Sequence, residues 1–310
     1  MALLLIVAGL LLLVFGGDAL VRGAVGASLR LGIPALIVSL TIVAFGTSAP
    51  ELVIVIQAAF DGVPQLALGN IIGSNIANIL LILGLPAVVF SIAAGGADTR
   101  RDFGMMIAAS VLFIGLLYAM PFGPLTGVIL LTVIAGIIAW TIKRGLASKA
   151  EAEALSADVE ETHDPLWKSA LFILGGLIAL PLGAKFLVDG AITVAERFGV
   201  SEAVIGLTIV AVGTSLPELA ATMAAGFRKQ ADVAIGNVLG SNMFNLLVIG
   251  GVAALFGPVA IDPQFLRLDV WVMLGASLLL VPYIFLKADL SRVWGLAFCL
   301  AYGAYMFAIL

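Results

Sequence analysis

The sequence predicts an all-α membrane protein with about ten transmembrane helices, arranged as two inverted five-helix repeats with broken helices at the midplane. Three observations lead to this fold class. The chain of 310 residues is 62% hydrophobic and 11% charged. Apolar runs of membrane-spanning length follow one another with short polar breaks, and a segment of the first half of the chain recurs in the second.

The composition argues against a soluble globular protein. Such proteins are about 45–50% apolar and about 25% charged, whereas this chain has a mean hydropathy of +1.21. A net charge of −4 without a basic patch gives no reason to expect nucleic acid as a partner. No nucleophile–base pair or phosphate-binding loop indicates an enzyme. The lone Cys299 and the lone His163 form no metal cluster, so we expect no cofactor.

The apolar runs divide the chain into two halves of five spans each. A polar stretch, 144–165, is expected to be a solvated cytoplasmic linker between a first repeat, 1–143, and a second repeat, 166–310. The expected spans are 2–25, 34–60, 65–90, 101–120, 124–143, 166–195, 200–227, 231–255, 266–286 and 291–310.

An internal repeat links the two halves. When the chain is shifted by 167 residues, residues 30–84 fall on 197–251 without a gap, and 25 of the 55 positions are identical. The matches include Pro, Glu, Ser and Asn, which chance similarity between apolar segments would not reproduce. Because five spans is an odd number, the second half enters the membrane in the opposite sense, and the repeat is inverted.

The distribution of basic residues predicts the orientation of the chain. With the N-terminus outside, most basic residues fall in or beside cytoplasmic loops, and only Arg197 and Arg267 are left outside. We therefore expect a multi-pass protein of the cell (inner) membrane with both termini outside. The basic residues assigned to the inside are Arg30, Arg100, Arg101, Lys143, Arg144, Lys149, Arg228, Lys229, Lys287 and Arg292.

Charges also occur inside the first and sixth spans. Asp18 and Arg22 fall on Lys185 and Asp189 under the same shift. Both pairs have the i, i+4 spacing that allows an ion pair on one helix face. The swapped signs would also allow pairing across the two halves. Stabilisation of the packing of these two spans explains the charges more simply than a direct role in transport.

The most informative stretch is Gly46-Thr47-Ser48-Ala49-Pro50-Glu51, which recurs as Gly213-Thr214-Ser215-Leu216-Pro217-Glu218. A carboxylate at bilayer depth costs several kcal/mol and marks a functional site by default. A structural kink with a hydrogen-bonded glutamate is the simpler alternative, but two matching copies favour function. Pro50 removes an amide donor, so we expect carbonyls such as that of Ala44 to be partly freed.

A second repeated motif supplies further oxygen atoms. Ser74 and Asn78 lie at i, i+4, and Gly69 and Gly73 would let another helix approach closely. Oxygen ligands suit calcium and sodium, and two carboxylates balance one divalent cation or two sodium ions. The candidate ligands are Glu51, Glu218, Thr47, Ser48, Thr214, Ser215, Ser74, Ser241, Asn78 and Asn245, with the backbone carbonyls of Ala44 and Ala211.

The paired Gly-Thr-Ser-x-Pro-Glu and Gly-Asn-x-x-Gly-Ser-Asn motifs resemble the two alpha-repeats of the calcium/cation antiporter superfamily, and most closely its prokaryotic sodium/calcium exchanger branch. The resemblance implies export of Ca²⁺ in exchange for Na⁺ by alternating access. It also implies that the first and sixth helices slide against a core of the other eight. Its ion ligands fall on the glutamates, hydroxyls and Asn78 named above. Asn245 departs from the aspartate common in the family, so the exchange stoichiometry stays open.

Two alternatives remain at this stage. A Ca²⁺/H⁺ antiporter of the same superfamily is one, although that branch carries glutamate where this chain has Gly73 and Gly240. An uncoupled cation channel is the other. Inorganic cations and membrane lipid are the expected partners, and no feature of the sequence indicates a protein partner.

Overall fold

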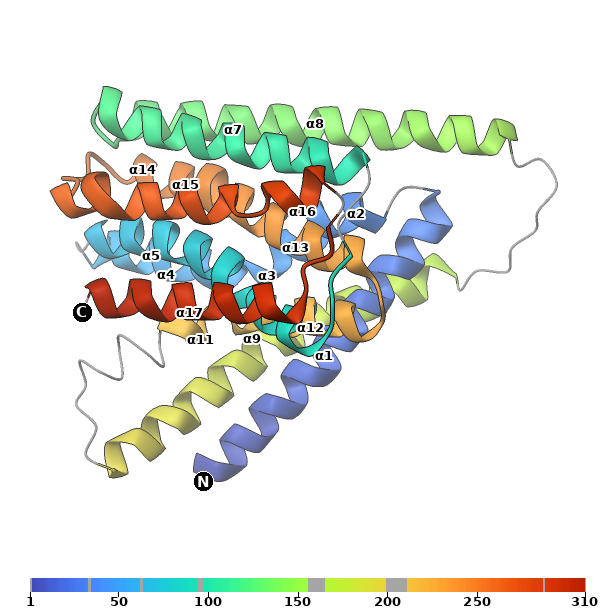
Figure 1. Cartoon of the computed structure of the whole chain (residues 1–310), viewed down its shortest axis with the longest axis horizontal. Helices are drawn as coiled ribbons and strands as arrows, with labels where there is room; N and C mark the ends of the chain where they lie inside the picture. Colours follow the sequence, from blue (N-terminus) through green and yellow to red (C-terminus); the bar gives the residue numbers. More distant parts are fainter. Residues whose placement is uncertain are drawn as a thin grey trace.

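The structure is a computed structural model that describes residues 2–32, 35–61, 64–93, 97–155, 165–198, 211–286 and 288–309. Nearly all of these residues are helical, and the described part contains no β-strand longer than an isolated bridge. Figure 1 shows a stack of roughly parallel helices, with α1 and α9 crossing one face of the stack at an angle. The predicted all-α class is confirmed for the described residues.

Two spans of the first half, 35–60 and 64–89, are interrupted by π-helical or kinked segments. The helices of this half are α1 (Ala2–Leu31), α2 (Ala35–Val38), η1 (Ser39–Val43), α3 (Ala44–Thr47), α4 (Ala49–Phe60), α5 (Pro64–Ala77), η2 (Asn78–Ile82), α6 (Gly84–Val89), α7 (Ala97–Ala119) and α8 (Pro124–Leu155).

The second half repeats much of this order. Its described elements are α9 (Leu166–Arg197), α11 (Ala211–Gly213), α12 (Leu216–Phe227), α13 (Ala231–Phe244), η4 (Asn245–Ile249), α14 (Gly250–Leu255), η5 (Phe265–Asp269), α15 (Val270–Leu278), α16 (Val281–Phe285) and α17 (Arg292–Ile309).

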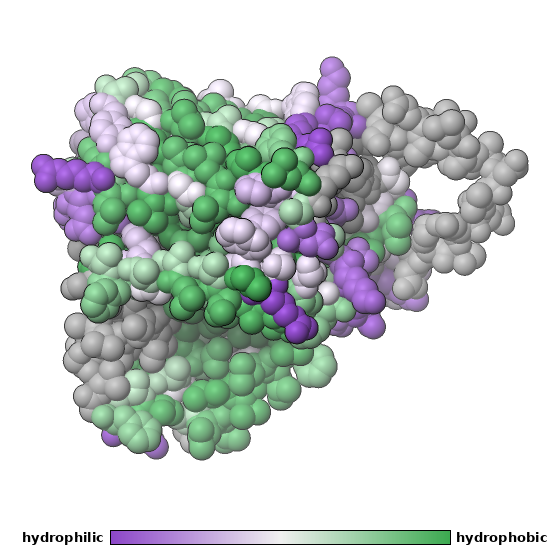
Figure 2. Space-filling model, in the orientation of Figure 1, coloured by the Kyte–Doolittle hydropathy of each residue, from purple (hydrophilic) through white to green (hydrophobic). Residues whose placement is uncertain are grey.

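The helices are long and apolar enough to cross a membrane. Among the described residues, eight helices meet this condition, and the bent pair Ser39–Thr47 and Ala49–Phe60 gives a ninth. The expected span 200–227 is described only from residue 211 onward. Figure 2 shows apolar residues across the middle of the visible face, with hydrophilic residues gathered toward its two ends. This distribution is typical of a protein whose middle lies in lipid.

Two boundaries differ from the sequence prediction. Helix α1 continues to Leu31 rather than ending near residue 25, and α8 continues to Leu155, well into the stretch predicted as a linker. The polar part of α8 is rich in alanine, glutamate and lysine, which are strong helix formers. Polarity marks where a helix leaves the membrane, but it does not end the helix.

Glycines join α1 to α9 in antiparallel register. Gly9, Gly16 and Gly23 face the backbone near Leu187, Leu180 and Ile173. A Cβ atom at Gly9 would lie 2.6 Å from the Leu187 nitrogen, and one at Gly23 would lie 2.7 Å from the Ile173 nitrogen. Small residues allow this close helix packing in membranes. The partner helix uses the glycines that correspond under the 167-residue shift, namely Gly176, Gly183 and Gly190.

The predicted ion pairs on these two helices are confirmed. Arg22 Nε lies 3.6 Å from Asp18 Oδ2 on α1, and Lys185 Nζ lies 3.2 Å from Asp189 Oδ2 on α9. The pairing across the two halves takes a different form from the one the sequence allows, because Asp18 also pairs with Arg228. In the antiparallel register the charged positions of α1 and α9 are offset along the helix pair and do not meet.

Two isolated β-bridges tie the loops of one half to those of the other. Ile92 pairs with Leu290 through backbone hydrogen bonds of 3.1 and 2.8 Å, and Phe122 pairs with Val259. Ile92 and Val259 correspond under the 167-residue shift, whereas Phe122 falls on Asp289, one residue before Leu290, so the two bridges repeat one contact with an offset of one residue. The large buried cluster beneath them contains residues from both halves, such as Ile79 and Leu246. The core of the molecule is therefore shared by the two repeats.

Candidate cation-binding site

Both copies of the glutamate motif break a helix at the same serine. Ser48 (φ −84°, ψ 6°) ends α3 and precedes α4, and Ser215 (φ −91°, ψ 7°) precedes α12. In the first half the break bends the span by 48°. Proline occupies the start of each following helix, where its missing N–H costs least. The sequence therefore produces two half-helices that begin at the level of the motif.

Each glutamate lies in the first turn of its half-helix. Glu51 belongs to α4 and Glu218 to α12. The first turn of a helix presents unpaired backbone N–H groups and a partial positive charge, both of which stabilise a nearby carboxylate. Both side chains are nevertheless almost completely buried, at 1% and 0% exposure. Ser48 of the first motif donates to the Glu218 carboxylate of the second over 2.9 Å, so the two motifs are in direct contact. Two buried acidic groups carried by touching motifs suit a cation between them.

The asparagine motif lies on α5–η2 in the first half and on α13–η4 in the second. In both halves the helix changes from α to π at the last asparagine, Asn78 and Asn245. A π-helical turn inside a membrane span often marks a functional site, because it shifts the following side chains and rearranges backbone pairing. The coincidence of both π turns with the repeated asparagine supports the assignment made from sequence.

Hydrogen bonds between the halves hold the two motifs together. Ser48 Oγ donates to Glu218 Oε1 over 2.9 Å, and Asn245 Nδ2 donates to Ser74 Oγ over 3.0 Å. Thr47 Oγ1 lies 3.5 Å from Ser241 Oγ. Nine of the ten predicted side-chain ligands are at most 6% exposed, and the tenth, Thr214, is half-buried. These contacts bring Thr47, Ser48 and Ser74 of the first half together with Glu218, Ser241 and Asn245 of the second in one buried polar cluster.

Several oxygens of this cluster have no hydrogen-bond partner among the described residues. They are Glu51 Oε2, Glu218 Oε2, Asn78 Oδ1, Asn245 Oδ1 and Ser215 Oγ. The amide groups of Asn78 and Asn245 are paired through their nitrogens, so their oxygens are the groups left available. Buried polar atoms are normally satisfied, and an unpaired one calls for an explanation. Unpaired carboxylate, amide and hydroxyl oxygens are the ligands that Ca²⁺ and Na⁺ prefer.

The expectation that Pro50 frees the Ala44 carbonyl is wrong for this structure. The Ala44 oxygen accepts the Ser48 N–H at 3.0 Å and the Thr47 hydroxyl at 3.3 Å. The amide that Pro50 lacks would have bonded to the carbonyl of Gly46, four residues back, and not to that of Ala44. A role of Ala44 as an ion ligand stays a prediction.

The remaining predicted residues are less enclosed or less fully described. Thr214 is half-buried at the start of the second motif, and Ala211 lies in the short helix α11. The close approach expected at Gly69 and Gly73 is not found among the described residues, since a Cβ at Gly69 would lie 3.4 Å from Phe265 Cζ and one at Gly73 would meet no atom within 4 Å. The second half does have such a contact, where a Cβ at Gly240 would lie 2.6 Å from the Leu40 oxygen. The counterpart of that contact would join Gly73 to Leu207, which lies outside the described residues.

Sequence reasoning missed residues that hold the predicted ligands. Asn237 accepts the Thr47 hydroxyl at 3.3 Å and donates to Thr222 Oγ1 at 3.1 Å and to the Glu218 carbonyl at 3.3 Å. Asn242 accepts the Asn78 amide at 3.0 Å and donates to the Asn75 carbonyl at 3.3 Å. The asparagines were visible as repeated polar residues. Thr222 gave no such signal, because its counterpart is Val55.

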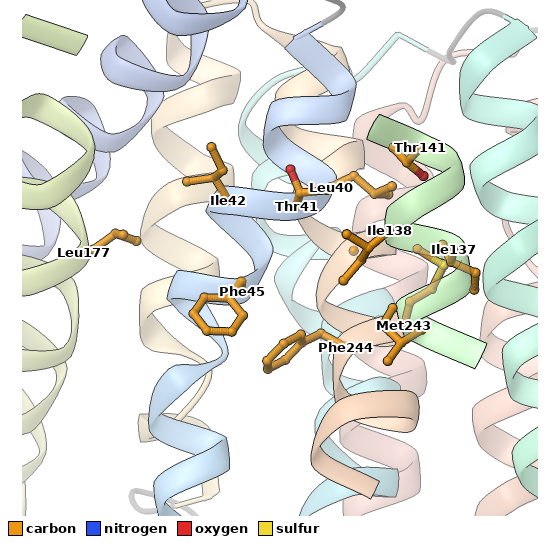
Figure 3. A pocket seen from close by; sticks show the side chains of 12 residues that line it. Leu40, Thr41, Ile42, Phe45, Ile137, Ile138, Thr141, Leu177, Met243 and Phe244 are labelled. Atoms are coloured by element: carbon orange, nitrogen blue, oxygen red, sulfur yellow. The ribbon is translucent and has the colours of Figure 1, made fainter. Parts of the chain in front are cut away.

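An apolar pocket of about 320 Å³ lies close to the site but is distinct from it. Figure 3 shows Phe45 and Phe244 facing each other along it, with Leu177 of α9 at one side. The two rings meet edge to face, with centroids 5.0 Å apart. The described residues that line it include no carboxylate and none of the predicted ion ligands. A space of this chemistry cannot hold a desolvated cation.

The fold and the site together define a membrane transporter built from inverted repeats, with a buried oxygen-lined site at the interface between the repeats. The model of the sodium/calcium exchanger protein family matches residues 1–143 and 168–310. The chain therefore belongs to this family of antiporters.

Known proteins similar to this chain agree with this assignment. The inner membrane protein YrbG of Escherichia coli is 38% identical over 90% of this chain and 87% of its own length. The sodium/calcium exchanger MaX1 of Methanosarcina acetivorans is 30% identical over 98% of this chain and 97% of its own. A more distant relative, the Ca²⁺/H⁺ antiporter ChaA of Bacillus subtilis, is 25% identical over 76% of this chain and 72% of its own.

A solved structure covers the whole chain. The sodium-calcium exchanger NCX_Mj, soaked with zero Na⁺ and Ca²⁺, superposes with a TM-score of 0.86 at 28% identity, over 100% of this chain and 99% of its own. The predicted fold class, with ten transmembrane helices in inverted repeats, is confirmed by this match.

Proposed function

We propose that this protein exchanges Ca²⁺ for Na⁺ across the membrane by alternating access, with the ions held between Glu51 and Glu218. The observation that carries the proposal is the set of unpaired buried oxygens contributed by both halves, with two carboxylates among them. Two carboxylates neutralise one Ca²⁺ or two Na⁺, so either load can cross the low-dielectric region without a large uncompensated charge.

The side chains have distinct roles in this proposal. Glu51 and Glu218 supply the charge, and the amide oxygens of Asn78 and Asn245 supply neutral ligands. Hydroxyls complete the coordination, among them Ser48, whose proton is directed to Glu218 at 2.9 Å and whose oxygen lone pairs therefore remain available to an ion. The remaining proposed ligands are Thr47, Ser74, Thr214, Ser215 and Ser241, with the carbonyls of Ala44 and Ala211.

The placement of the chain in the cell follows from the same reasoning. We infer insertion in the cell membrane as two oppositely oriented repeats, 1–143 and 166–310, with both termini outside and 144–165 inside. The distribution of arginine and lysine between the loops supports this orientation.

Calcium-45 flux in proteoliposomes tests the exchange directly. Sodium, potassium and proton gradients are imposed separately on vesicles containing the purified protein. The proposal predicts rapid uptake only with an outward sodium gradient. Uptake driven by a pH gradient would instead indicate a Ca²⁺/H⁺ antiporter, and full uptake without any opposing gradient would indicate a channel. Either result contradicts the proposal.

A further inference from the structure

Three charged positions carry opposite signs in the two halves of the chain. Asp18 and Arg22 on α1 correspond to Lys185 and Asp189 on α9. The third position follows the half-helix that carries the glutamate: it is Asp61 after α4 and Arg228 after α12, again with opposite signs. All three positions are charged in both halves, and at each of them the charge in one half is opposite to the charge in the other. The six residues therefore form two sets of three with opposite charges. We call them the α1 set (Asp18, Arg22, Arg228) and the α9 set (Lys185, Asp189, Asp61).

In the α1 set, the ion pair between the helix and the residue that follows the half-helix is formed. Arg228 Nε donates to Asp18 Oδ1 over 2.6 Å, and Arg22 Nε lies 3.6 Å from the other carboxylate oxygen. The Asp18–Arg228 pair links a helix of the first half to the loop that follows α12 in the second half. Beside it, α1 lies directly against α12, since a Cβ at Gly17 would be 2.7 Å from the Ala220 oxygen. The ion pair therefore fastens α1 to the half-helix that carries Glu218.

In the α9 set, the corresponding ion pair between Lys185 and Asp61 is not formed. Among the described residues Lys185 forms an ion pair within its own helix alone, with Asp189 at 3.2 Å, and 68% of its side chain is exposed. Asp61 accepts the amide of Gln57 at 3.3 Å, and no ion pair joins it to Lys185 in the described part of the chain. The packing of α9 on α4 at Val53, which would correspond to that of α1 on α12 at Ala220, is not formed either. Val53, the counterpart of Ala220, is 64% exposed, whereas Ala220 lies against α1.

Inverted repeats give this asymmetry a meaning. In a transporter of this architecture, exchanging the conformations of the two halves converts a state open to one side into the state open to the other. The same exchange would release Asp18 from Arg228 and bring Lys185 to Asp61. Both members of each pair reverse sign between the halves, so Asp18 with Arg228 and Lys185 with Asp61 are each a pair of opposite charges. Each pair can form without any residue of the other set.

We propose that Asp18–Arg228 and Lys185–Asp61 are alternating positioning pairs: the first holds α1 on the core in the state described above, and the second holds α9 on the core in the opposite-facing state. This rests on the proposed alternating-access function, but not on which ions are exchanged. Each pair is partly exposed, so each biases the equilibrium between the two states modestly. We expect about a two- to fivefold shift when one pair is lost, the range typical of accessible ion pairs.

Paired cysteines test the proposal without measuring transport. In a background with Cys299→Ser, one variant carries Asp18→Cys with Arg228→Cys, and the other carries Asp61→Cys with Lys185→Cys. Short bifunctional thiol reagents are applied in chelator, in sodium and in calcium. We expect both pairs to cross-link and their yields to change in opposite directions between conditions. Absence of Asp61–Lys185 cross-linking in every condition, with the other pair cross-linking normally, would overturn the proposal.

Charge variants provide a second readout that a purely structural role would not give. Asp18→Asn should weaken apparent ion affinity about two- to fivefold on one side of the membrane and strengthen it on the other. Lys185→Gln should do the reverse, and Asp18→Arg with Arg22→Asp and Arg228→Asp, which reverses all three signs of the α1 set, should restore the native values. Equal loss on both sides in both single variants, or no rescue by the exchange, would contradict alternating pairs. If cross-linking alternates but sodium does not drive calcium flux, the positioning pairs stand and the proposed exchange fails.

Discussion

The most informative single change is Glu218→Gln, because it keeps the shape of the side chain and removes its charge. Glutamine can still accept the Ser48 hydroxyl through Oε1, as Glu218 does at 2.9 Å. Its amide nitrogen then takes the place of the unpaired Oε2 and presents N–H groups where an oxygen faced the site. The cluster should therefore fold much as before, with one negative charge left opposite a divalent cation.

The expected loss follows from the burial of the group. Glu218 is completely buried, and leaving one member of a buried ion pair uncompensated costs about 3–5 kcal/mol. Each 1.4 kcal/mol changes a binding constant tenfold, so calcium affinity should fall roughly 10²- to 10⁴-fold. Sodium-driven calcium-45 uptake should fall to background at micromolar calcium. Calcium should also no longer raise the melting temperature of the purified protein, because that stabilisation depends on the ratio of ligand concentration to Kd.

Asp262→Asn is the matched control. It also replaces a carboxylate by an amide, but Asp262 is exposed and accepts the backbone N–H of Gln264 at 2.8 Å, away from the site. Uptake and thermal stabilisation should match those of the native protein. If Glu218→Gln transported calcium within about threefold of the control, the reasoning from buried charge would be refuted.

Three further predictions use the asymmetry of the structure. Ser48→Ala should lower the melting temperature of the ion-free protein, since it removes a buried hydrogen bond to a charged acceptor, whereas Ser215→Ala should lower it less because Ser215 Oγ has no partner among the described residues. Both variants should weaken calcium binding, since both hydroxyls are proposed ligands; equal losses of melting temperature without calcium would contradict this. Asn245→Asp adds a third carboxylate to the site and should change the sodium dependence or the electrogenicity of exchange, measured as current at fixed gradients; an unchanged current and sodium dependence would refute that role. Gly9→Ala should lower the melting temperature and slow transport, because its Cβ would lie 2.6 Å from the Leu187 nitrogen. Gly175→Ala should be neutral, since its Cβ would meet no atom of the described residues within 4 Å. Equal effects of the two variants on the melting temperature would contradict the close packing of α1 on α9.

Much of the site could be predicted because polar residues inside apolar spans are rare. Glu51 and Asn78 stand out in their own spans, and their exact recurrence at Glu218 and Asn245 makes a structural accident improbable. The helix break at Ser48 also followed from local chemistry, since the proline two residues later favours a new helix start. The internal repeat thus indicated which polar residues matter, because the same residues occur at corresponding positions of both halves.

What could not be predicted depends on tertiary packing. The role of Asn237 depends on which groups of Thr47 and Glu218 face it, and no spacing rule carries that information. Thr222 has Val55 as its counterpart, so the repeat did not mark it. The extension of α8 to Leu155 was missed because polar composition was interpreted as the end of a helix rather than as its exit from the membrane.

The partner of Asp18 could not be predicted from the sequence, because it too depends on tertiary packing. Its i, i+4 spacing to Arg22 was visible, but the pair with Arg228 requires the antiparallel register of α1 and α9 and the position of α12 to be known. The swapped signs in the sequence indicated that the halves complement each other. Only the arrangement in space shows which complementary contact is made.

The central claim is that one buried cation lies between the carboxylates of the two halves. A density map of the protein at saturating calcium tests this most directly. We predict a single strong peak at the level of the two helix breaks, with oxygens of both Glu51 and Glu218 at about 2.3–2.6 Å. Carboxylates turned apart, with calcium bound elsewhere or not at all, would contradict the account.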